Sequence, residues 1–125
     1  MIVAGFGFRA AASLDSLQDA LARASAGKKP AKIATALDKA QTPVFKALAA
    51  SSGCPALGID ETDLNMQSIQ THSDASHRTR GTGSVSEAAA LAAAGPGALL
   101  IAPRVVSRDG MATCALAQMG QGDPS

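Results

Sequence analysis

Aromatic residues are scarce in this sequence of 125 residues. It contains no tryptophan and no tyrosine, and its only phenylalanines are Phe6, Phe8 and Phe45. Single-stranded nucleic acids are usually bound by aromatic side chains along a basic groove, and proteins that bind duplexes carry a large positive charge. Eleven lysines and arginines against ten acidic residues give a net charge of only +1. We therefore expect no nucleic-acid partner.

Long hydrophobic runs and cysteine clusters are also missing. No window reaches the roughly 18 apolar residues that a membrane helix requires, and no basic residue stands before the short apolar opening, as in a secretory signal. Cys54 and Cys114 are too few and too far apart for a disulfide framework or a thiolate metal site, which favours buried free thiols. We expect a cytoplasmic protein without a membrane segment, a bound metal or a resident cofactor.

Apolar runs with the character of strands alternate with amphipathic helical patterns. Ser13 predicts the start of a first helix, Thr42 and Pro43 that of a second, and acidic residues open a short helix within 60–69. The strands predicted between them cover 1–6, 32–37 and 55–59. This alternation favours parallel strands joined by helices.

The last third of the chain predicts one more helix and a hairpin. Ser84 with Glu87 three residues later forms a capping-box pattern, and Gly95 followed by proline ends that helix. Two apolar runs, 98–106 and 111–119, flank an Asp-Gly turn. The prediction is a three-layer α/β/α fold with a mixed sheet that ends in an antiparallel pair, formed by a single domain over 1–118, with a flexible tail over 119–125.

Two glycine-containing stretches are candidates for binding. The loop before the last helix combines guanidinium donors, permissive glycines and a helix N-terminus, which together suit a carboxylate or phosphate. Its candidate residues are Arg78, Arg80, Gly81, Thr82, Gly83 and Ser84. A solvated basic loop before an ordinary capped helix is the alternative.

The other stretch, Gly5 to Ala10, fits the G-x-G-x-x-A form of the dinucleotide-binding turn. That turn requires a helix to begin within it, whereas Ser13 predicts a later start. Nucleotide binding and glycines that simply let the chain turn therefore both remain as readings of this stretch. His72 and His77 lie five residues apart without cysteines or helical spacing beside them, so we expect surface histidines and not metal ligands.

Several of these stretches together resemble a known family. They are VAGFGFR near the start, the Asp38-Lys39 pair, LGI at 57–59 with the acidic segment leading to Ser73, TGSVSEAAAL at 82–91 and TCALA near the end. The chain is similar over 2–118 to the family formed by the C-terminal domain of cobalt-precorrin-5A hydrolase and the free-standing cobalamin biosynthesis protein CobE. Members usually carry a cysteine where Phe8 stands here, so no thiol role is expected at that position. The hydrolase half of the two-part members lies outside this sequence.

The resemblance implies binding of a precorrin or corrinoid intermediate, whose rim of carboxylates needs several anion sites beside an apolar surface. Sites near strand ends converge on one edge of an α/β sheet. The implied ligand-binding residues, beside those of the 78–84 loop, are Gly5, Gly7, Phe8, Arg9, Ser13, Asp38, Lys39 and Ser73. For Phe6 and Phe8, packing in the core is an equally good reading.

Two modes of action stay open at this point. A binding or carrier protein is favoured, because no nucleophile and base can be paired from the sequence. The alternative is an enzyme acting on a precorrin, as a hydrolase or a helper of ring contraction, with Asp38, Lys39 or His72 as acid or base. Other cobalamin-pathway enzymes are expected partners in either case.

Overall fold

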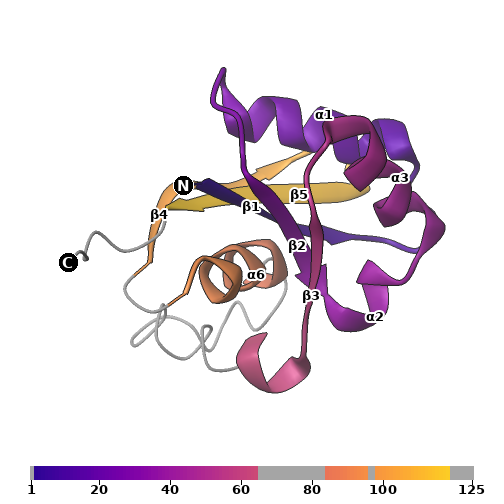
Figure 1. Cartoon of the computed structure of the whole chain (residues 1–125). Coiled ribbons are helices and arrows are strands. Elements are labelled where there is room, and N and C mark those ends of the chain that lie inside the picture. Colours follow the sequence, from indigo (N-terminus) through magenta and orange to yellow (C-terminus); the bar gives the residue numbers. More distant parts are fainter. Residues whose placement is uncertain (1, 65–83, 96–97, 119–125) are drawn as a thin grey trace.

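A five-stranded mixed sheet forms the centre of the structure, a computed structural model that describes residues 2–64, 84–95 and 98–118 (Figure 1). Within those residues the strand order is β3-β2-β1-β5-β4. The strands are β1 (Ile2–Phe8), β2 (Lys32–Ala36), β3 (Ala56–Ile59), β4 (Leu99–Val106) and β5 (Ala112–Gln118).

The first three strands are parallel and the last two are antiparallel. β1 pairs in parallel with β2, which pairs in parallel with β3, and helices make the crossovers that parallel pairing requires. β5 runs antiparallel to β1 along its whole length and antiparallel to β4 on its other side. The predicted terminal hairpin is confirmed, and its second strand inserts beside β1.

Helices cover both faces of this sheet, which confirms the predicted three-layer α/β/α architecture. α1 (Leu14–Ser25) and α3 (Pro43–Ser52) lie on one face, α6 (Ser84–Ala94) lies on the other, and the single turn α2 (Leu37–Ala40) follows β2 (Figure 1). None of the helices within the described ranges combines the length and apolarity needed to cross a membrane.

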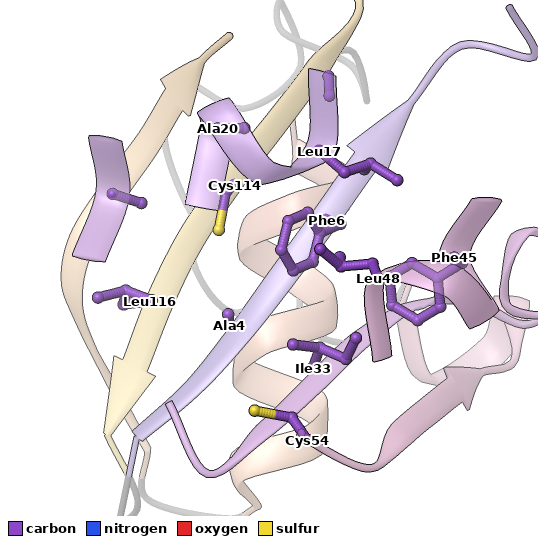
Figure 2. Close-up of a cluster of buried hydrophobic side chains, with 12 residues drawn as sticks. Ala4, Phe6, Leu17, Ala20, Ile33, Phe45, Leu48, Cys54, Cys114 and Leu116 are labelled. Atoms are coloured by element: carbon purple, nitrogen blue, oxygen red, sulfur yellow. The ribbon is translucent and has the colours of Figure 1, made fainter. Parts of the chain in front are cut away.

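The larger hydrophobic core lies between the sheet and the pair α1 and α3 (Figure 2). Its bulkiest members are fully buried, and each stabilises the fold by about 1.5–3 kcal/mol relative to an exposed side chain. They are Phe6, Leu17, Ile33, Phe45, Leu48 and Leu116. Cys54 and Cys114 are buried free thiols in the same layer, as predicted.

On the other face, small residues let α6 approach the sheet closely. The second core is mostly alanine, and a Cβ built on Gly5 would lie only 2.1 Å from the carbonyl oxygen of Ser86. Gly5 is buried within β1, where it makes room for the backbone of α6. The close packing of α6 on the sheet therefore requires a residue without a side chain at position 5.

The reading of Gly5 and Gly7 as turn residues is wrong, because β1 continues through Phe8; the chain turns at 9–12, and α1 begins only at Leu14. A nucleotide would need the turn and the helix start to coincide, so the dinucleotide reading falls with it. β2 also ends one residue earlier than predicted, and Leu37 becomes the first residue of α2. The predicted short helix after β3 is present as a helical turn at 61–64, and the rest of 60–69 lies outside the described residues.

Helix caps agree with the sequence to different degrees. Ser13 caps α1 as predicted, and it forms a reciprocal capping box with Ser16. Thr42 precedes Pro43 at the start of α3, but its hydroxyl donates to the carbonyl oxygen of Lys39. α6 begins at Ser84 itself, one residue before the predicted start, and the carboxylate of Glu87 accepts a hydrogen bond from the backbone N–H of Arg104 on β4.

Candidate functional site

The carboxyl edge of the parallel strands collects most of the candidate residues that the structure describes. β1, β2 and β3 end at Phe8, Ala36 and Ile59, and parallel strands present these ends at one side of the sheet. The first turn of α6 lies at the same edge, because Gly7 neighbours Val85 and Ser86 whereas Gly5, farther from the strand end, neighbours Ser86 and Ala90. The ends of β1 and β2 and the start of α6 therefore lie at one edge, whereas the 78–84 loop, predicted to line the same cleft, precedes α6 outside the described residues.

Phe8 is the aromatic residue of this edge. Its half-buried ring stacks on Phe45 with 6.0 Å between ring centroids, and Phe45 in turn makes an edge contact with the fully buried Phe6 at 5.8 Å. The ammonium of Lys39 lies 5.3 Å from the centroid of the Phe8 ring, within cation–π range. An apolar surface and a positive charge are thus placed side by side at the end of β1, whereas Phe6 belongs to the core.

The end of β1 also meets the first turn of α6. The hydroxyl of Thr113 donates to the carbonyl oxygen of Gly7 at 3.2 Å. A Cβ on Gly7 would lie 3.0 Å from the Thr113 oxygen and 3.7 Å from the backbone nitrogen of Ser86. The first amides of a helix have no intrahelical acceptor and carry the positive end of its dipole. This end of α6 therefore favours negative charge near Gly7 and Thr113.

Asp38 belongs to a different part of the same edge. Its carboxylate accepts a hydrogen bond of 3.0 Å from the backbone N–H of Lys39. It lines an open groove of about 400 Å³ together with Asp60 and Glu61, on the side of β2 and β3. Asp38 and Lys39 were predicted as one ligand site, but the structure places the aspartate in an acidic surrounding and the lysine beside an aromatic ring.

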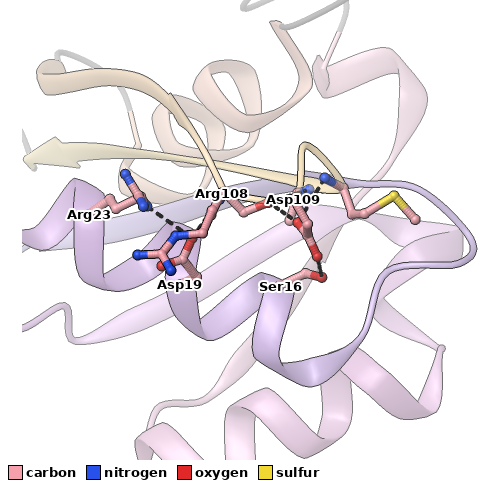
Figure 3. A network of polar contacts seen from close by, with 8 residues as sticks. Ser16, Asp19, Arg23, Arg108 and Asp109 are labelled. Atoms are coloured by element: carbon pink, nitrogen blue, oxygen red, sulfur yellow. Dashed lines mark hydrogen bonds and ion pairs between the residues drawn. The ribbon is translucent and has the colours of Figure 1, made fainter.

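The start of α1 and the turn between β4 and β5 form a polar network next to this edge (Figure 3). Ser16 donates its hydroxyl to Asp109, whose carboxylate also accepts from the hydroxyl of Ser107 and the backbone N–H of Met111. These bonds, the one from Ser107 above all, lower the pKa of Asp109 to about 2. Three donors already occupy this carboxylate, so its role is to join the hairpin to α1.

Asp19 makes a second link between α1 and the same turn. Its carboxylate accepts the backbone N–H of Arg108 at 2.6 Å and the Nε–H of Arg23 at 2.9 Å, and these two bonds lower its pKa. The pairing of Ser16 with Asp109, and of Asp19 with the same turn, was not predicted from the sequence. Only the Ser-Arg-Asp-Gly hairpin signal was visible, and it does not show what the turn contacts.

The remaining candidates are placed as follows. Ser13 uses its hydroxyl as an acceptor for the backbone N–H of Ser16, and Arg9 has an exposed side chain while its backbone N–H donates to the carbonyl oxygen of Met111. Gly5 is buried below α6. His72, Ser73, Arg78, Arg80, Gly81, Thr82 and Gly83 lie outside the described residues, as does the side chain of Ser84.

Within the described ranges, no group of three histidine, cysteine or acidic side chains is arranged to hold a metal ion. Burial raises the pKa of the Cys114 thiol far above its usual value, which keeps it protonated and unreactive. The features that remain are a ring, an ammonium group and a helix N-terminus. They suit the binding of a flat apolar molecule with anionic substituents.

Comparison with known proteins gives the family. The family model for the cobalamin synthesis G C-terminus matches residues 2–117. The structure is similar to that of cobalamin biosynthesis protein chiG from Agrobacterium tumefaciens, with 35% identity, a TM-score of 0.75, and 95% of this chain and 98% of that chain covered. No match is found among curated proteins.

A second solved structure, CobE from the cobalamin biosynthetic pathway, is 28% identical with a TM-score of 0.77, over 95% of this chain and 90% of that one. A cobalamin biosynthesis protein G homologue from Sulfolobus solfataricus shares the fold at 20% identity and a TM-score of 0.67, over 98% of this chain and 37% of that one. With a family model that spans nearly its whole length, the chain belongs to the cobalamin synthesis G C-terminal family, whose solved members CobE and chiG are named as cobalamin biosynthesis proteins.

Proposed function

We propose that this protein binds a precorrin or corrinoid intermediate of cobalamin biosynthesis at the carboxyl edge of its sheet, as a binding or carrier protein. The contact between Lys39 and Phe8 carries the proposal. A partly exposed ring offers the macrocycle an apolar surface, and the ammonium group beside it offers a partner for a carboxylate of the rim.

The N-terminus of α6 supplies a second anion site, on the opposite face of the sheet from that ring and beside Gly7. Gly7 has no side chain to cover the first turn of the helix, and Thr113 holds the end of β1 in place through its bond to the Gly7 carbonyl. A carboxylate of the ligand at this end of β1 would face the helix amides. Arg78 and Arg80 remain predicted contacts from the loop before α6.

An enzymatic role is the alternative. Asp38 and Lys39 are the described residues proposed for acid–base chemistry, and the structure separates their side chains into an acidic groove and an aromatic surrounding. Cys114 is unsuited to act as a nucleophile because it is buried and protonated. Binding without turnover is the function that these residues favour. A cytoplasmic location and contact with other enzymes of the pathway belong to the same proposal.

Anaerobic titration with corrin-pathway intermediates tests this function. Cobyrinic acid, a corrin with free carboxylate side chains, and its full methyl ester form a matched pair of probes. We expect saturable binding of the acid, weakened by added salt, and much weaker binding of the ester, because ester groups carry no charge. Failure of every corrin and precorrin to bind would overturn the proposal, and conversion of a bound intermediate would favour the enzyme.

A further inference from the structure

A second feature of the carboxyl edge has no part in the proposed corrin site. It is the open groove of about 400 Å³ between α2 and the helical turn at 61–64, called the acidic groove below. Its lining consists of apolar side chains with carboxylates among them. These residues are Ala36, Leu37, Asp38, Ile59, Asp60, Glu61 and Leu64.

The apolar part of the acidic groove is held in place by the sheet. Leu37 is 49% exposed although it is a large hydrophobic residue. Its side chain lies across Gly58 on β3, where an added Cβ would come within 2.7 Å of the Leu37 Cδ1 atom. Ile59 and Leu64 are partly buried and pack against the core beneath α6. An apolar surface in a concavity, next to other apolar side chains, is typical of a place where a partner binds.

The acidic part forms no ion pair among the residues that the structure describes. Asp60 accepts the backbone N–H of Asp63 at the start of the helical turn, and Asp38 accepts that of Lys39. In the part of the chain that the structure describes, the one ion pair joins Arg23 and Asp19, on α1. No described cation therefore pairs with the carboxylates of the groove, and the nearest candidate on α2, Lys39, contacts the ring of Phe8 instead.

These charges decide which occupant fits. A polycarboxylate ligand would be repelled by three carboxylates, and the described residues form no set of three ligands for a metal ion. Positive groups attached to an apolar body match both parts of the groove. We propose that the acidic groove binds a basic amphipathic segment of a partner protein, with an apolar side chain against Leu37 and lysines or arginines against Asp38, Asp60 and Glu61.

The acidic groove is placed where a bound partner could receive the ligand of a carrier protein. Asp38 and Lys39 are consecutive residues of α2, so a partner bound in the groove would lie next to the proposed corrin site. An enzyme docked there could receive the ligand directly. The interaction is nevertheless independent of corrin binding, and it can be tested without any corrin.

The test uses the isotopically labelled full chain and two synthetic helical peptides, one built from leucine and lysine and the other from leucine and glutamate. We expect the lysine peptide to shift the backbone amide signals of 36–38 and 58–64 in a saturable and salt-sensitive manner. The glutamate peptide should leave them unchanged. The double variant Asp60→Asn with Glu61→Gln should weaken binding of the lysine peptide roughly fivefold to thirtyfold, which corresponds to about 1–2 kcal/mol for the two lost charge pairs together.

Asp60→Asn keeps a residue that can cap the helical turn, so the fold should survive. Asp63→Asn, in the same turn but outside the groove lining, is the matched control, and Leu37→Ser at its exposed position tests the apolar part separately. Shifts centred on Asp19 and Asp109, or no shifts at all, would overturn the proposal. So would shifts of the 58–64 amides caused by cobyrinic acid, or shifts of the groove amides caused by raising the concentration of the protein alone, which would indicate a second copy as the occupant.

Discussion

The hydroxyl of Ser16 donates a hydrogen bond of 2.5 Å to a carboxylate oxygen of Asp109, and this bond joins the first turn of α1 to the turn between β4 and β5 (Figure 3). The other carboxylate oxygen accepts the hydroxyl of Ser107 at 2.6 Å and the backbone N–H of Met111 at 3.1 Å. Since β5 pairs with β1, fixing this turn also fixes the strand that carries Thr113 to the candidate site.

The first prediction concerns the pH dependence of this link. The hydrogen bond from Ser107, with those from Ser16 and Met111, lowers the pKa of Asp109 to about 2 in the folded protein, whereas an unfolded aspartate has a pKa of about 3.9. A lowered pKa stabilises the fold fully above the unfolded value, and the contribution is lost as the pH falls through the folded one. We therefore expect Asp109→Asn to lower the urea midpoint at neutral pH, and this difference from the parent to shrink in acid.

Urea unfolding of the parent and the variant across the acid range measures this effect. Asp63→Asn, at an exposed position after β3, serves as the control and should follow the parent. A difference between the Asp109 variant and the parent that stays constant down to about pH 2 would contradict the linkage.

The second prediction concerns the contact between β1 and α6. An alanine at position 5 would place its Cβ 2.1 Å from the Ser86 carbonyl oxygen and 2.4 Å from the Ala90 nitrogen, both backbone atoms that cannot move alone. Gly5→Ala should therefore lower the free energy of unfolding by about 3 kcal/mol or more. Gly27→Ala, at a positive φ of 94° with open space around it, should lower it by only about 1–2 kcal/mol.

Thermal and urea unfolding of both variants decide this point. Equal losses for the two would mean that α6 can move away from the sheet at little cost. In that case the tight packing of helix and strand would not determine where the N-terminus of α6 lies.

Much of the fold could be predicted from the sequence because its signals are local. Ser13 predicts the start of α1, and Asp-Gly at 109–110 predicts the terminal hairpin. Both elements are found where predicted. The position of β5 between β1 and β4 could not be predicted, since strand order depends on contacts between distant segments. The glycines of β1 were mistaken for a turn, because a glycine required by an approaching helix looks the same in sequence as one required by a turn.

For the candidate site, the sequence predicts which strands and helices meet but not how their side chains are directed. The ends of β1 and β2 lie at one edge because parallel strands impose that arrangement, and the 78–84 loop predicted beside them is outside the described residues. The side-chain directions were not predictable. Asp38 and Lys39 are neighbours in sequence, but α2 directs one into the acidic groove and the other to the ring of Phe8.

The third prediction tests the role of Lys39. Lys39→Met removes the charge beside Phe8 and keeps an unbranched apolar side chain of similar length. We expect cobyrinic acid to bind about five to ten times more weakly, which corresponds to about 1–1.4 kcal/mol for one partly screened charge pair. Lys46→Met, at an exposed position of α3, is the matched control and should bind like the parent.

Isothermal titration at low and moderate salt measures both variants. The difference between Lys39→Met and the parent should decrease as salt is added, because screening weakens the lost attraction. An affinity equal to that of the parent at low salt would remove Lys39 from the site, and equal losses in both lysine variants would show that only net charge matters.

The last prediction concerns two buried hydroxyls. Within the described residues neither Ser86 nor Ser25 has a hydrogen-bond partner for its hydroxyl, and both side chains are buried. An unpaired buried hydroxyl is unfavourable and alanine is the better helix former, so Ser86→Ala and Ser25→Ala should each raise the free energy of unfolding by about 1–2 kcal/mol.

The responses of the two variants to ligand should differ. Ser86 lies in the first turn of α6 next to Gly7, whereas Ser25 ends α1. If the Ser86 hydroxyl pairs with a ligand carboxylate, cobyrinic acid will raise the melting temperature of Ser86→Ala less than that of the parent, while Ser25→Ala keeps the full increase. A Ser86→Ala protein that melts below the parent without ligand would instead show that this hydroxyl already has a partner in the free protein.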